Sequence, residues 1–300
     1  MVYTSFNQMQ QRAKNQGKFV VSAAVAADRE VLEAIKYADE LDLANAVLVG
    51  DKEKIEEIGA EINLDLSRFR IVDEPDPVKA TQKACQQVRT GDADCLMKGY
   101  INTSDFMRTV LNKEDGLRTG RVLSHLAAFE IPGFDRIIYV TDGGINVSPT
   151  LEEKIQILQN AIDYLHRAGY QAPRTAILSA NELVNLKQPV TTEAALIKVM
   201  AERGSIRGAE IDGPLSFDLA VSKEAAKHKK MNSPVMGEAD LLLCPNIEVG
   251  NILGKCLIYC SKAIMGGLVL GAMAPIILTS RASSKEAKLA SLLMAAVVKQ

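Results

Sequence analysis

The sequence predicts an α/β protein with mainly parallel sheets and helices on both faces. Short apolar runs, typical of buried parallel strands, alternate with amphipathic segments of helical period. The connections between them are short, as in folds built from strand–helix–strand units. With 300 residues, the chain is longer than one small core requires, which indicates either one large α/β unit or two domains.

The first part of the chain repeats this strand–helix order. An amphipathic helix at 5–16 comes before the first apolar run, KFVVSAAVAA, and Asp28 then opens the next helix. Ligands of such sheets bind beyond the carboxyl ends of the strands, so the residues after each strand are the first candidates for a site. The expected strands are 18–27, 46–50, 69–72 and 95–98, and the helices between them begin at 28, 51 and 76.

The pattern starts again after Pro132 and Gly133. A strand over 136–141 ends in Asp-Gly-Gly, and a long helix over 150–169 follows it. The last strand and helix of the chain are too little to form a domain alone, so we expect them to return to the first sheet. The remaining expected elements are strands at 175–179 and 239–244 and helices at 191–203, 223–231 and 285–299, with the unassigned segment AEIDGPLSF at 209–217.

One stretch, GGLVLGAMAPIILTSRASSK at 266–285, combines a predicted Gly-Gly turn, an apolar strand-like run and a polar turn before a helix. Free backbone N–H groups at the helix start, with the hydroxyls of Ser280, Ser283 and Ser284, are suited to binding an oxyanion. Arg281 adds a planar bidentate donor for phosphate. An ordinary capped helix with a solvent-facing arginine is the alternative, and this turn alone leaves it open.

A second anion site is expected after the strand at 95–98. Lys98 and Gly99 stand at the strand end, and Thr103 and Ser104 follow at the start of a helix. Free amides and hydroxyls in this order again suit an anion. An ordinary helix with Ser104 as its N-cap is the alternative.

The polar loop at 112–121 carries Arg118 and Arg121 on either side of Gly120. Two arginines in such a loop are usually solvated surface. In a protein with other phosphate-like turns, the alternative is a lid that closes over an anion.

Composition and motifs exclude several classes of function. The net charge of −2 gives no attraction to nucleic acid or to an anionic membrane surface, and the absence of Trp argues against base-stacking platforms. No dinucleotide-binding, P-loop, zinc-protease or nucleophile-elbow motif is found, and no acidic cluster indicates a metal site. Five scattered cysteines, with no second pair to complete a zinc site beside Cys256 and Cys260, indicate a reduced, cytoplasmic protein. The N-terminus has no apolar signal core.

Six segments in order resemble the phosphate acetyl/butyryltransferase family, and most closely its phosphate butyryltransferase branch. Together they cover nearly the whole chain, and six segments in register are hard to obtain by chance. They are MKGYINTSDF (97–106), RTGRVLSH (118–125), VTDGGINVSPT (140–150), EIDGPLSFD (210–218), LLCPNIEVGN (242–251) and GGLVLGAMAPIILTSRASS (266–284).

The resemblance implies the two-domain fold of the isocitrate/isopropylmalate dehydrogenase type. The first α/β domain would combine 1–131 with the C-terminal end, 269–300, and the second, 132–268, would be inserted between them. In the family the active cleft lies between the domains, and the second domain usually forms the dimer contact. The resemblance therefore implies a homodimer or a higher homo-oligomer.

The implied reaction is acyl-CoA + phosphate ⇌ acyl phosphate + CoA, with coenzyme A as a substrate and with neither a bound cofactor nor a metal. By position, Ser280 would hydrogen-bond the thiol or the carbonyl oxygen, Arg281 would hold the phosphoryl oxygens, and Arg121 would clamp phosphate or CoA. The resemblance also implies a larger set of substrate-binding residues. These are Lys98, Gly99, Thr103, Ser104, Arg118, Asn146, Asn251, Ser283 and Ser284.

One position departs from the family pattern. The acetyltransferase branch has an Asp, proposed as the base for the CoA thiol, where this chain has Ala287. Glu286 is adjacent, but on a helix its side chain points about 100° away. We therefore expect a mechanism without an essential carboxylate, in which Arg281 or the helix N-terminus helps to ionise a thiol of pKa about 8.5. A butyryl group is the favoured acyl group, on the branch resemblance.

Three alternatives remain open at this point. One is a phosphate acetyltransferase of the same family, and another is a subunit that binds CoA or acyl phosphate without catalysis. The third is a metal-dependent NAD(P) 2-hydroxyacid dehydrogenase of the same fold. That enzyme would need a carboxylate cluster and a catalytic Tyr/Lys pair, which the sequence does not place.

Overall fold

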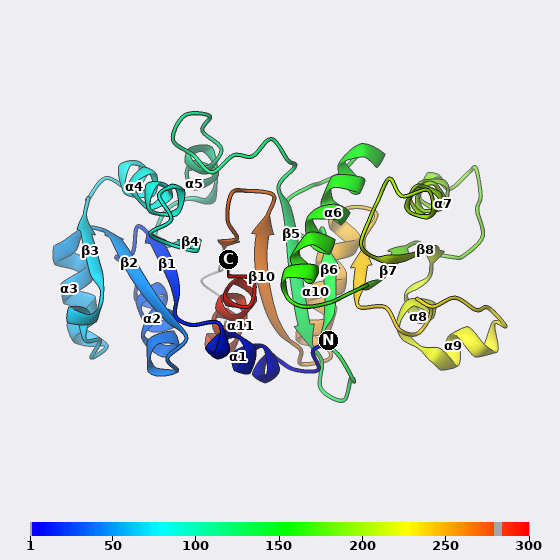
Figure 1. The fold of residues 1–300 in the computed structure, drawn as a ribbon, viewed down its shortest axis with the longest axis horizontal. Coiled ribbons are helices and arrows are strands. Elements are labelled where there is room, and N and C mark those ends of the chain that lie inside the picture. The colour runs from blue at the N-terminus through cyan, green and yellow to red at the C-terminus, as the bar shows by residue number, and fades with distance from the viewer. Residues whose placement is uncertain (1, 279–283, 300) are drawn as a thin grey trace. The chain divides into compact units, whose positions relative to one another are not determined.

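The computed structural model describes residues 2–278 and 284–299, and it confirms the predicted α/β class (Figure 1). Helices and strands alternate along most of the chain. None of the described helices is long and apolar enough to span a membrane.

The chain divides into two compact units. The first unit consists of 6–121 and 266–300, and the second unit consists of 1–5 and 122–265. The boundaries expected from the sequence, 131/132 and 268/269, both lie later in the chain than these changeovers. The start of the chain also belongs to the second unit, and not to the first.

The first unit contains most of the regular strand–helix repeats expected from the sequence. Asp28, Asp51 and Asp76 open its helices as predicted, because each side chain accepts backbone N–H groups of the first helical turn. Its elements are α1 (Phe6–Asn15), β1 (Phe19–Ala24), α2 (Arg29–Glu40), β2 (Ala44–Gly50), α3 (Lys52–Glu61), a 3-10 turn (Leu66–Arg68), β3 (Arg70–Asp73), α4 (Pro77–Arg89), β4 (Cys95–Lys98), α5 (Thr103–Val110), β10 (Ile264–Leu270, which begins in the second unit), β11 (Ile276–Ile277) and α11 (Lys285–Ala296).

The strands of the first unit lie in the order β3-β2-β1-β4-β11-β10. All neighbours pair in parallel except β10 and β11, which are antiparallel. Helices α4 and α5 pack on one face, and α1, α2 and α11 pack together on the other (Figure 1). The strand order reverses between β1 and β4, and such a switch point opens a crevice at the carboxyl ends of the strands.

Five strands of the second unit lie side by side in the order β5-β6-β9-β7-β8. Only the β5–β6 pair is antiparallel. Its buried cluster includes Phe129, Leu178, Leu219, Leu242 and Leu257. The elements are β5 (Ser124–Glu130), β6 (Ile138–Thr141), α6 (Leu151–Arg167), β7 (Arg174–Leu178), α7 (Pro189–Glu202), β8 (Glu210–Leu215), α8 (Phe217–Val221), α9 (Lys223–His228), β9 (Leu241–Leu243) and α10 (Ile247–Tyr259).

The N-terminal residues are fixed to the second unit through Tyr3, whose ring is fully buried. The Tyr3 hydroxyl donates to the Ala168 carbonyl at 2.7 Å, and the Tyr3 amide donates to the Tyr170 hydroxyl at 3.1 Å. The Tyr3 carbonyl accepts from the Ile137 amide at 2.8 Å. These bonds attach the chain start at the end of the sheet where β6 begins.

The predicted Gly-Gly turn at 266–267 is wrong. Both glycines lie inside strand β10. A Cβ atom on Gly266 would stand 2.8 Å from Met294 Sδ and from the backbone of Ala290, and the Gly267 amide donates to Ser291 Oγ at 2.9 Å. The glycine at 266 therefore allows α11 to approach the strand closely, which is a common role of glycine in a strand interior.

Candidate active site

The switch point of the first unit brings Lys98 and Gly99 next to the end of β1. The Gly99 amide donates to the Ala24 carbonyl at 2.8 Å, and a Cβ atom at position 99 would stand only 2.2 Å from the Val25 carbonyl oxygen. No side chain fits there without a backbone shift. Gly99 is therefore required because two segments of the backbone approach each other closely at this point. The Lys98 ammonium is half-buried and donates to the Gly99 carbonyl at 3.3 Å.

Helix α5 begins directly after this strand end. Its N-cap is Asn102, so Ser104 is not the cap that the simpler alternative required. Asn102 makes no side-chain capping bond, and Thr103 and Ser104 are both exposed in the first turn. This turn therefore keeps N–H donors and two hydroxyls near the switch point, which is the arrangement that binds anions at helix N-termini.

The loop with Arg118 and Arg121 is attached to the connection between β10 and β11. The backbone of Arg118 forms an isolated antiparallel β-bridge with Ala272. The hydroxyl of the neighbouring Thr119 donates to the Gly271 carbonyl. Both arginine side chains belong to exposed residues. The loop thus places Arg118 beside the segment that leads into β11.

The residues singled out before α11 are only partly described. Ser280, Arg281 and Ser283 lie outside the described residues. Ser284 is the exposed N-cap of α11, and its hydroxyl accepts from the Ala287 amide at 3.2 Å. The predicted polar start of this helix is therefore present at Ser284.

Two cationic contacts fix the first turns of α11 against α2. The Lys288 ammonium, on an almost fully buried residue, lies 2.8 Å from the Glu30 carboxylate. The Lys285 ammonium stands 4.0 Å from the centre of the Tyr37 ring. Between them, the pKa of Glu286 is lowered, chiefly by its own backbone N–H and by the Ser284 hydroxyl.

In the second unit, the loop after β6 is organised around Asp142, which is only 3% exposed. Its carboxylate accepts from the backbone N–H groups of His125 at 3.1 Å, Gly144 at 2.7 Å and Ile145 at 2.9 Å. It also accepts from Asn146 Nδ2 at 2.6 Å. With the Asn146 amide, which donates at 3.4 Å, five hydrogen bonds to one buried carboxylate hold this glycine-rich loop in place.

The predicted residues Asn146 and Asn251 both attach to this loop. Asn146 Nδ2 also donates to the Leu123 carbonyl at 2.8 Å, and Asn251 Nδ2 donates to the Gly143 carbonyl at 3.2 Å. A Cβ atom on Gly143 would stand 2.8 Å from the backbone of Gly250 in α10. The two asparagines therefore have structural contacts in the loop, and the exposed Asn251 also borders solvent.

His125 was not singled out as a site residue from the sequence. Its Nδ1 atom is buried with no hydrogen-bond partner among the described residues, and a Cβ atom on Gly144 would stand 3.0 Å from its ring. Burial lowers the pKa of His125, and the nearby Asp142 carboxylate opposes that shift. The imidazole is thus held beside a buried carboxylate by packing, and only the Asp-Gly-Gly motif hinted at this arrangement.

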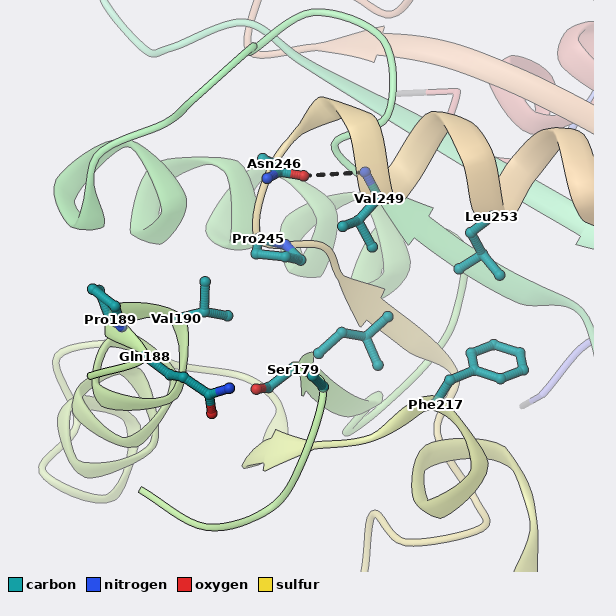
Figure 2. A pocket seen from close by; sticks show the side chains of 11 residues that line it. Ser179, Gln188, Pro189, Val190, Phe217, Pro245, Asn246, Val249 and Leu253 are labelled. Atoms are coloured by element: carbon teal, nitrogen blue, oxygen red, sulfur yellow. Dashed lines mark hydrogen bonds between the residues drawn. The ribbon is translucent and has the colours of Figure 1, made fainter. Parts of the chain in front are cut away.

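A mainly apolar pocket of about 490 Å³ lies at the carboxyl ends of β7 and β9 in the second unit (Figure 2). Ser179 and Gln188 point toward one another at its edge, while the Asn246 side chain is turned to the Val249 amide at 3.1 Å (Figure 2). Phe217 and Leu253 contribute apolar wall. None of the site residues predicted from the sequence lines this pocket.

The structure therefore brings the predicted residues together in separate groups. Lys98, Gly99, Thr103 and Ser104 share the switch point of the first unit, and Asn146 and Asn251 share the Asp142 loop of the second. Within the described part of the chain, no three His, Cys, Asp or Glu side chains are placed to hold a metal ion. The polar groups available are those that bind and orient anions.

Comparisons with known sequences agree with this inventory. A family model described as Phosphate acetyl/butaryl transferase matches residues 74–296. The phosphate butyryltransferase of Clostridium beijerinckii is 47% identical over 294 residues, which cover 98% of this chain and 97% of that protein. The phosphate acetyltransferase of Thermotoga maritima is 40% identical over 285 residues, which cover 95% and 96%.

Solved structures give the same result. A branched-chain phosphotransacylase from Enterococcus faecalis V583 has a TM-score of 0.83 at 34% identity, covering 94% of this chain and 100% of that one. A 4-hydroxythreonine-4-phosphate dehydrogenase from Klebsiella pneumoniae has a TM-score of 0.60 at 13% identity, which shows a common fold alone. The fold, the family match and the near full-length identities lead to one conclusion: the chain belongs to the phosphate acetyl/butyryltransferase family of phosphate acyltransferases.

Proposed function

We propose that this enzyme transfers a short acyl group, with butyryl favoured, between coenzyme A and inorganic phosphate. The observation that carries the choice of butyryl is the identity of 47% and 45% to two clostridial phosphate butyryltransferases over almost the whole chain. The reaction is acyl-CoA + phosphate ⇌ acyl phosphate + CoA. Coenzyme A is a substrate here, and the proposal includes no bound cofactor.

In the direction of acyl-CoA synthesis, the CoA sulfur attacks the carbonyl carbon of the acyl phosphate. A C–S bond forms, the C–O bond to phosphate breaks, the phosphate leaves, and the thiol proton is lost to phosphate or solvent. We assign Arg281 to the phosphoryl oxygens, Ser280 to the thiol or the carbonyl oxygen, and Arg121 to phosphate or CoA. Such groups act by positioning and charge stabilisation, which supply much of the rate enhancement in reactions of this kind.

The proposed substrate-binding residues act around these three. The strand end and helix start of the first unit supply N–H groups and hydroxyls to the anionic parts of both substrates, and Arg118 adds a cation. Support comes from the exposed first turn of α5 and from the backbone approach that only Gly99 permits. The full set is Lys98, Gly99, Thr103, Ser104, Arg118, Asn146, Asn251, Ser283 and Ser284.

We further propose that no carboxylate serves as an essential base. Glu286 is the nearest candidate by sequence, and its lowered pKa makes it a weaker base for a thiol than an ordinary glutamate. A Glu286→Gln variant should keep both turnover and CoA binding. Loss of turnover with CoA binding intact would contradict this part of the mechanism.

The active form is proposed to be a cytoplasmic homodimer that associates through the second unit. Among the described residues, twelve large apolar side chains of the second unit are exposed, against four of the first. Five of the twelve lie in or next to α7: Leu183, Val184, Leu186, Leu196 and Val199. Apolar side chains that are exposed close together are typical of interaction sites, and these five support the proposed interface.

A chain-length series is the test of the proposed function. Purified enzyme is given C2 to C6 acyl-CoA substrates, straight and branched, with and without phosphate, and free thiol release is followed. We expect phosphate-dependent release that is fastest with a C4 substrate. Fastest release with acetyl-CoA would favour the acetyltransferase alternative, and no release with any substrate would favour the non-catalytic alternative.

A further inference from the structure

A pocket of about 440 Å³ lies in the first unit, between the start of α4 and the turn that joins β4 to α5. This volume is in the range of small-molecule sites. The residues that line this α4–α5 pocket are Pro77, Val78, Tyr100, Ile101, Asn102 and Asp105. The pocket therefore adjoins the strand end and helix start that carry the proposed anion-binding residues Thr103 and Ser104.

The α4–α5 pocket gathers apolar surface that is scarce in its unit. Tyr100 is 58% exposed and Val78 is 44% exposed. Among the described residues of the first unit, Leu111 and Met273 are the other large apolar side chains that are exposed. Exposed apolar side chains that lie together are typical of binding sites. The pair at this pocket therefore indicates a ligand with an apolar face.

Backbone hydrogen bonds hold both sides of the pocket in place. The Tyr100 amide donates to the Val25 carbonyl at 3.0 Å, which fixes the turn after β4. On the other side, the Asp76 carboxylate accepts from the Lys79 amide at 2.8 Å and caps the start of α4. A ligand therefore meets a preformed surface, and little of its binding free energy is lost in ordering the protein.

We propose, resting on the proposed function in which CoA is a substrate, that the α4–α5 pocket binds the adenine ring of coenzyme A. The base stacks on the Tyr100 ring, and a single base requires only one aromatic side chain. Asn102 makes no side-chain capping bond, and its amide matches the N6 donor and the N7 acceptor at the edge of adenine.

The place of the pocket fits the order of groups in CoA, in which a diphosphate follows the adenosine. Thr103 and Ser104 lie between the lining residues Asn102 and Asp105 in the first turn of α5. Their hydroxyls and N–H groups are suited to the diphosphate, as at other helix N-termini that bind anions. One helical turn thus contributes to binding both the base and the diphosphate.

The lining favours the nucleotide over the acyl end of the substrate. Asp105 contributes a carboxylate, which is paired with Arg108 at 2.9 Å. A butyryl chain has no hydrogen-bonding group for this carboxylate or for the Asn102 amide, and covering these polar groups with it would cost free energy. Adenine carries an amino group that can donate to either side chain.

Isothermal titration calorimetry of the full-length enzyme with CoA tests the pocket without requiring turnover. Tyr100→Ala should weaken CoA binding by roughly tenfold, because it removes the stacking surface. Tyr100→Phe, which keeps an aromatic ring, should bind CoA as the wild type does. The matched control is Leu111→Ala, which removes an exposed apolar side chain at the other end of α5 and should leave binding unchanged.

Adenosine 3′,5′-bisphosphate, the nucleotide part of CoA, distinguishes the base from the rest of the ligand. It should compete with CoA for the wild type, and it should compete roughly tenfold less well for Tyr100→Ala. If Tyr100→Ala weakened CoA binding but left competition by the nucleotide unchanged, the pocket would hold the pantetheine or acyl part, and the proposal would be overturned.

Photolabelling of the unmodified chain covers the case in which a variant fails to fold. The enzyme is irradiated with 8-azido-CoA, digested with trypsin and analysed by mass spectrometry. The label should appear in the peptides 71–79 or 99–108, which carry the two sides of the pocket, and excess CoA should prevent it. Label confined to other peptides would overturn the proposal.

Failure of the pocket and failure of the proposed reaction give different results. If the enzyme releases thiol from acyl-CoA but Tyr100→Ala binds CoA as the wild type does, the pocket is wrong and the reaction stands. If no acyl-CoA is turned over but Tyr100→Ala weakens CoA binding, the reaction is wrong and the pocket stands. A wild type that does not bind CoA overturns both.

Discussion

The strand ends of the two units use polar groups in opposite ways. In the first unit, Lys98, Thr103 and Ser104 surround a switch point and leave hydroxyls and N–H donors exposed. In the second unit, the Asp142 carboxylate accepts from Gly144, Ile145 and Asn146 of its own loop and from the His125 amide of strand β5. The first region leaves its hydrogen-bond donors available for an anion, whereas the second uses its donors to fix the conformation of a loop. We therefore expect the first unit to supply charge for the proposed reaction and the second to supply fixed geometry.

The largest expected effect is on the catalytic rate, through a residue of the first unit. In the proposed mechanism Arg281 stabilises the transition state as a charged donor, so Arg281→Gln should lower kcat/KM by roughly 10²–10³. Steady-state kinetics with butyryl-CoA and phosphate measure this. Arg70→Gln, an exposed arginine of the same unit, is the control and should leave the rate unchanged. A loss below about tenfold would remove Arg281 from the proposed mechanism.

Asp142 tests the structural side. Asp142→Ala should lower the free energy of unfolding by about 3 kcal/mol, because buried N–H donors lose their acceptor. Urea unfolding followed by circular dichroism measures it. Glu224→Ala, with a side chain 84% exposed, is the control in the same unit and should change stability by less than about 0.5 kcal/mol. A change as small as the control's would show that the loop does not depend on this carboxylate.

The asymmetry in exposed apolar surface can be tested by placing a charge on each unit. Leu186 of the second unit is 87% exposed, and Leu111 of the first is 40% exposed. Leu186→Asp should weaken self-association by about tenfold or more, because it puts a charge into the proposed apolar interface. Leu111→Asp should not. Sedimentation velocity over a concentration series compares the two, and equal dissociation constants would refute an interface at this part of the second unit.

The smallest expected effect concerns pH. The Glu238 carboxylate pairs with Lys223, with Arg174 at 2.8 Å and with Arg136 at 3.9 Å. A hydrogen bond from Lys223 is the largest cause of its lowered pKa. The resulting stability is present above the unfolded value of about 4.5 and is lost as pH falls through the lower folded value.

Glu238→Gln should therefore flatten the acid side of the stability profile below about pH 4.5, and it should cost about 1 kcal/mol at neutral pH. Urea unfolding at a series of pH values measures both. Glu210→Gln, whose carboxylate lies 4.0 Å from the same Arg174, is the matched control and should keep the wild-type slope. An unchanged slope in Glu238→Gln would show that this ion pair does not control acid stability.

The apolar strands and capped helices of the first unit could be predicted from the sequence because their signals are local. A run such as KFVVSAAVAA and an Asp at each helix start carry the information within a few residues. Two elements of the second unit gave no such signal. Strand β5 mixes His125 with small residues, and it is stabilised by its antiparallel neighbour β6.

Helix α10 was missed for a related reason. It follows Pro245 and contains Gly250 and Gly254, which are typical of a loop. In the structure, a Cβ atom on Gly250 would stand 2.5 Å from the Asp142 carbonyl oxygen, and one on Gly254 would stand 3.2 Å from the Phe129 ring. These glycines are required by close packing against distant residues, and a single sequence does not contain that information. The same holds for the glycine at 266 inside β10.

The attachment of Tyr3 has a consequence for how the protein is made. During synthesis, Tyr3 emerges first, but its partners Ile137, Ala168 and Tyr170 follow more than a hundred residues later. Until then Tyr3 cannot form its native hydrogen bonds. The helix that follows it in the chain, α1, belongs to the first unit and can pack earlier. An expression fragment that starts at 122 would lack Tyr3 altogether, leaving the Ile137 amide without its acceptor. A recombinant second unit should therefore carry the first five residues of the chain, joined by a linker, to be complete.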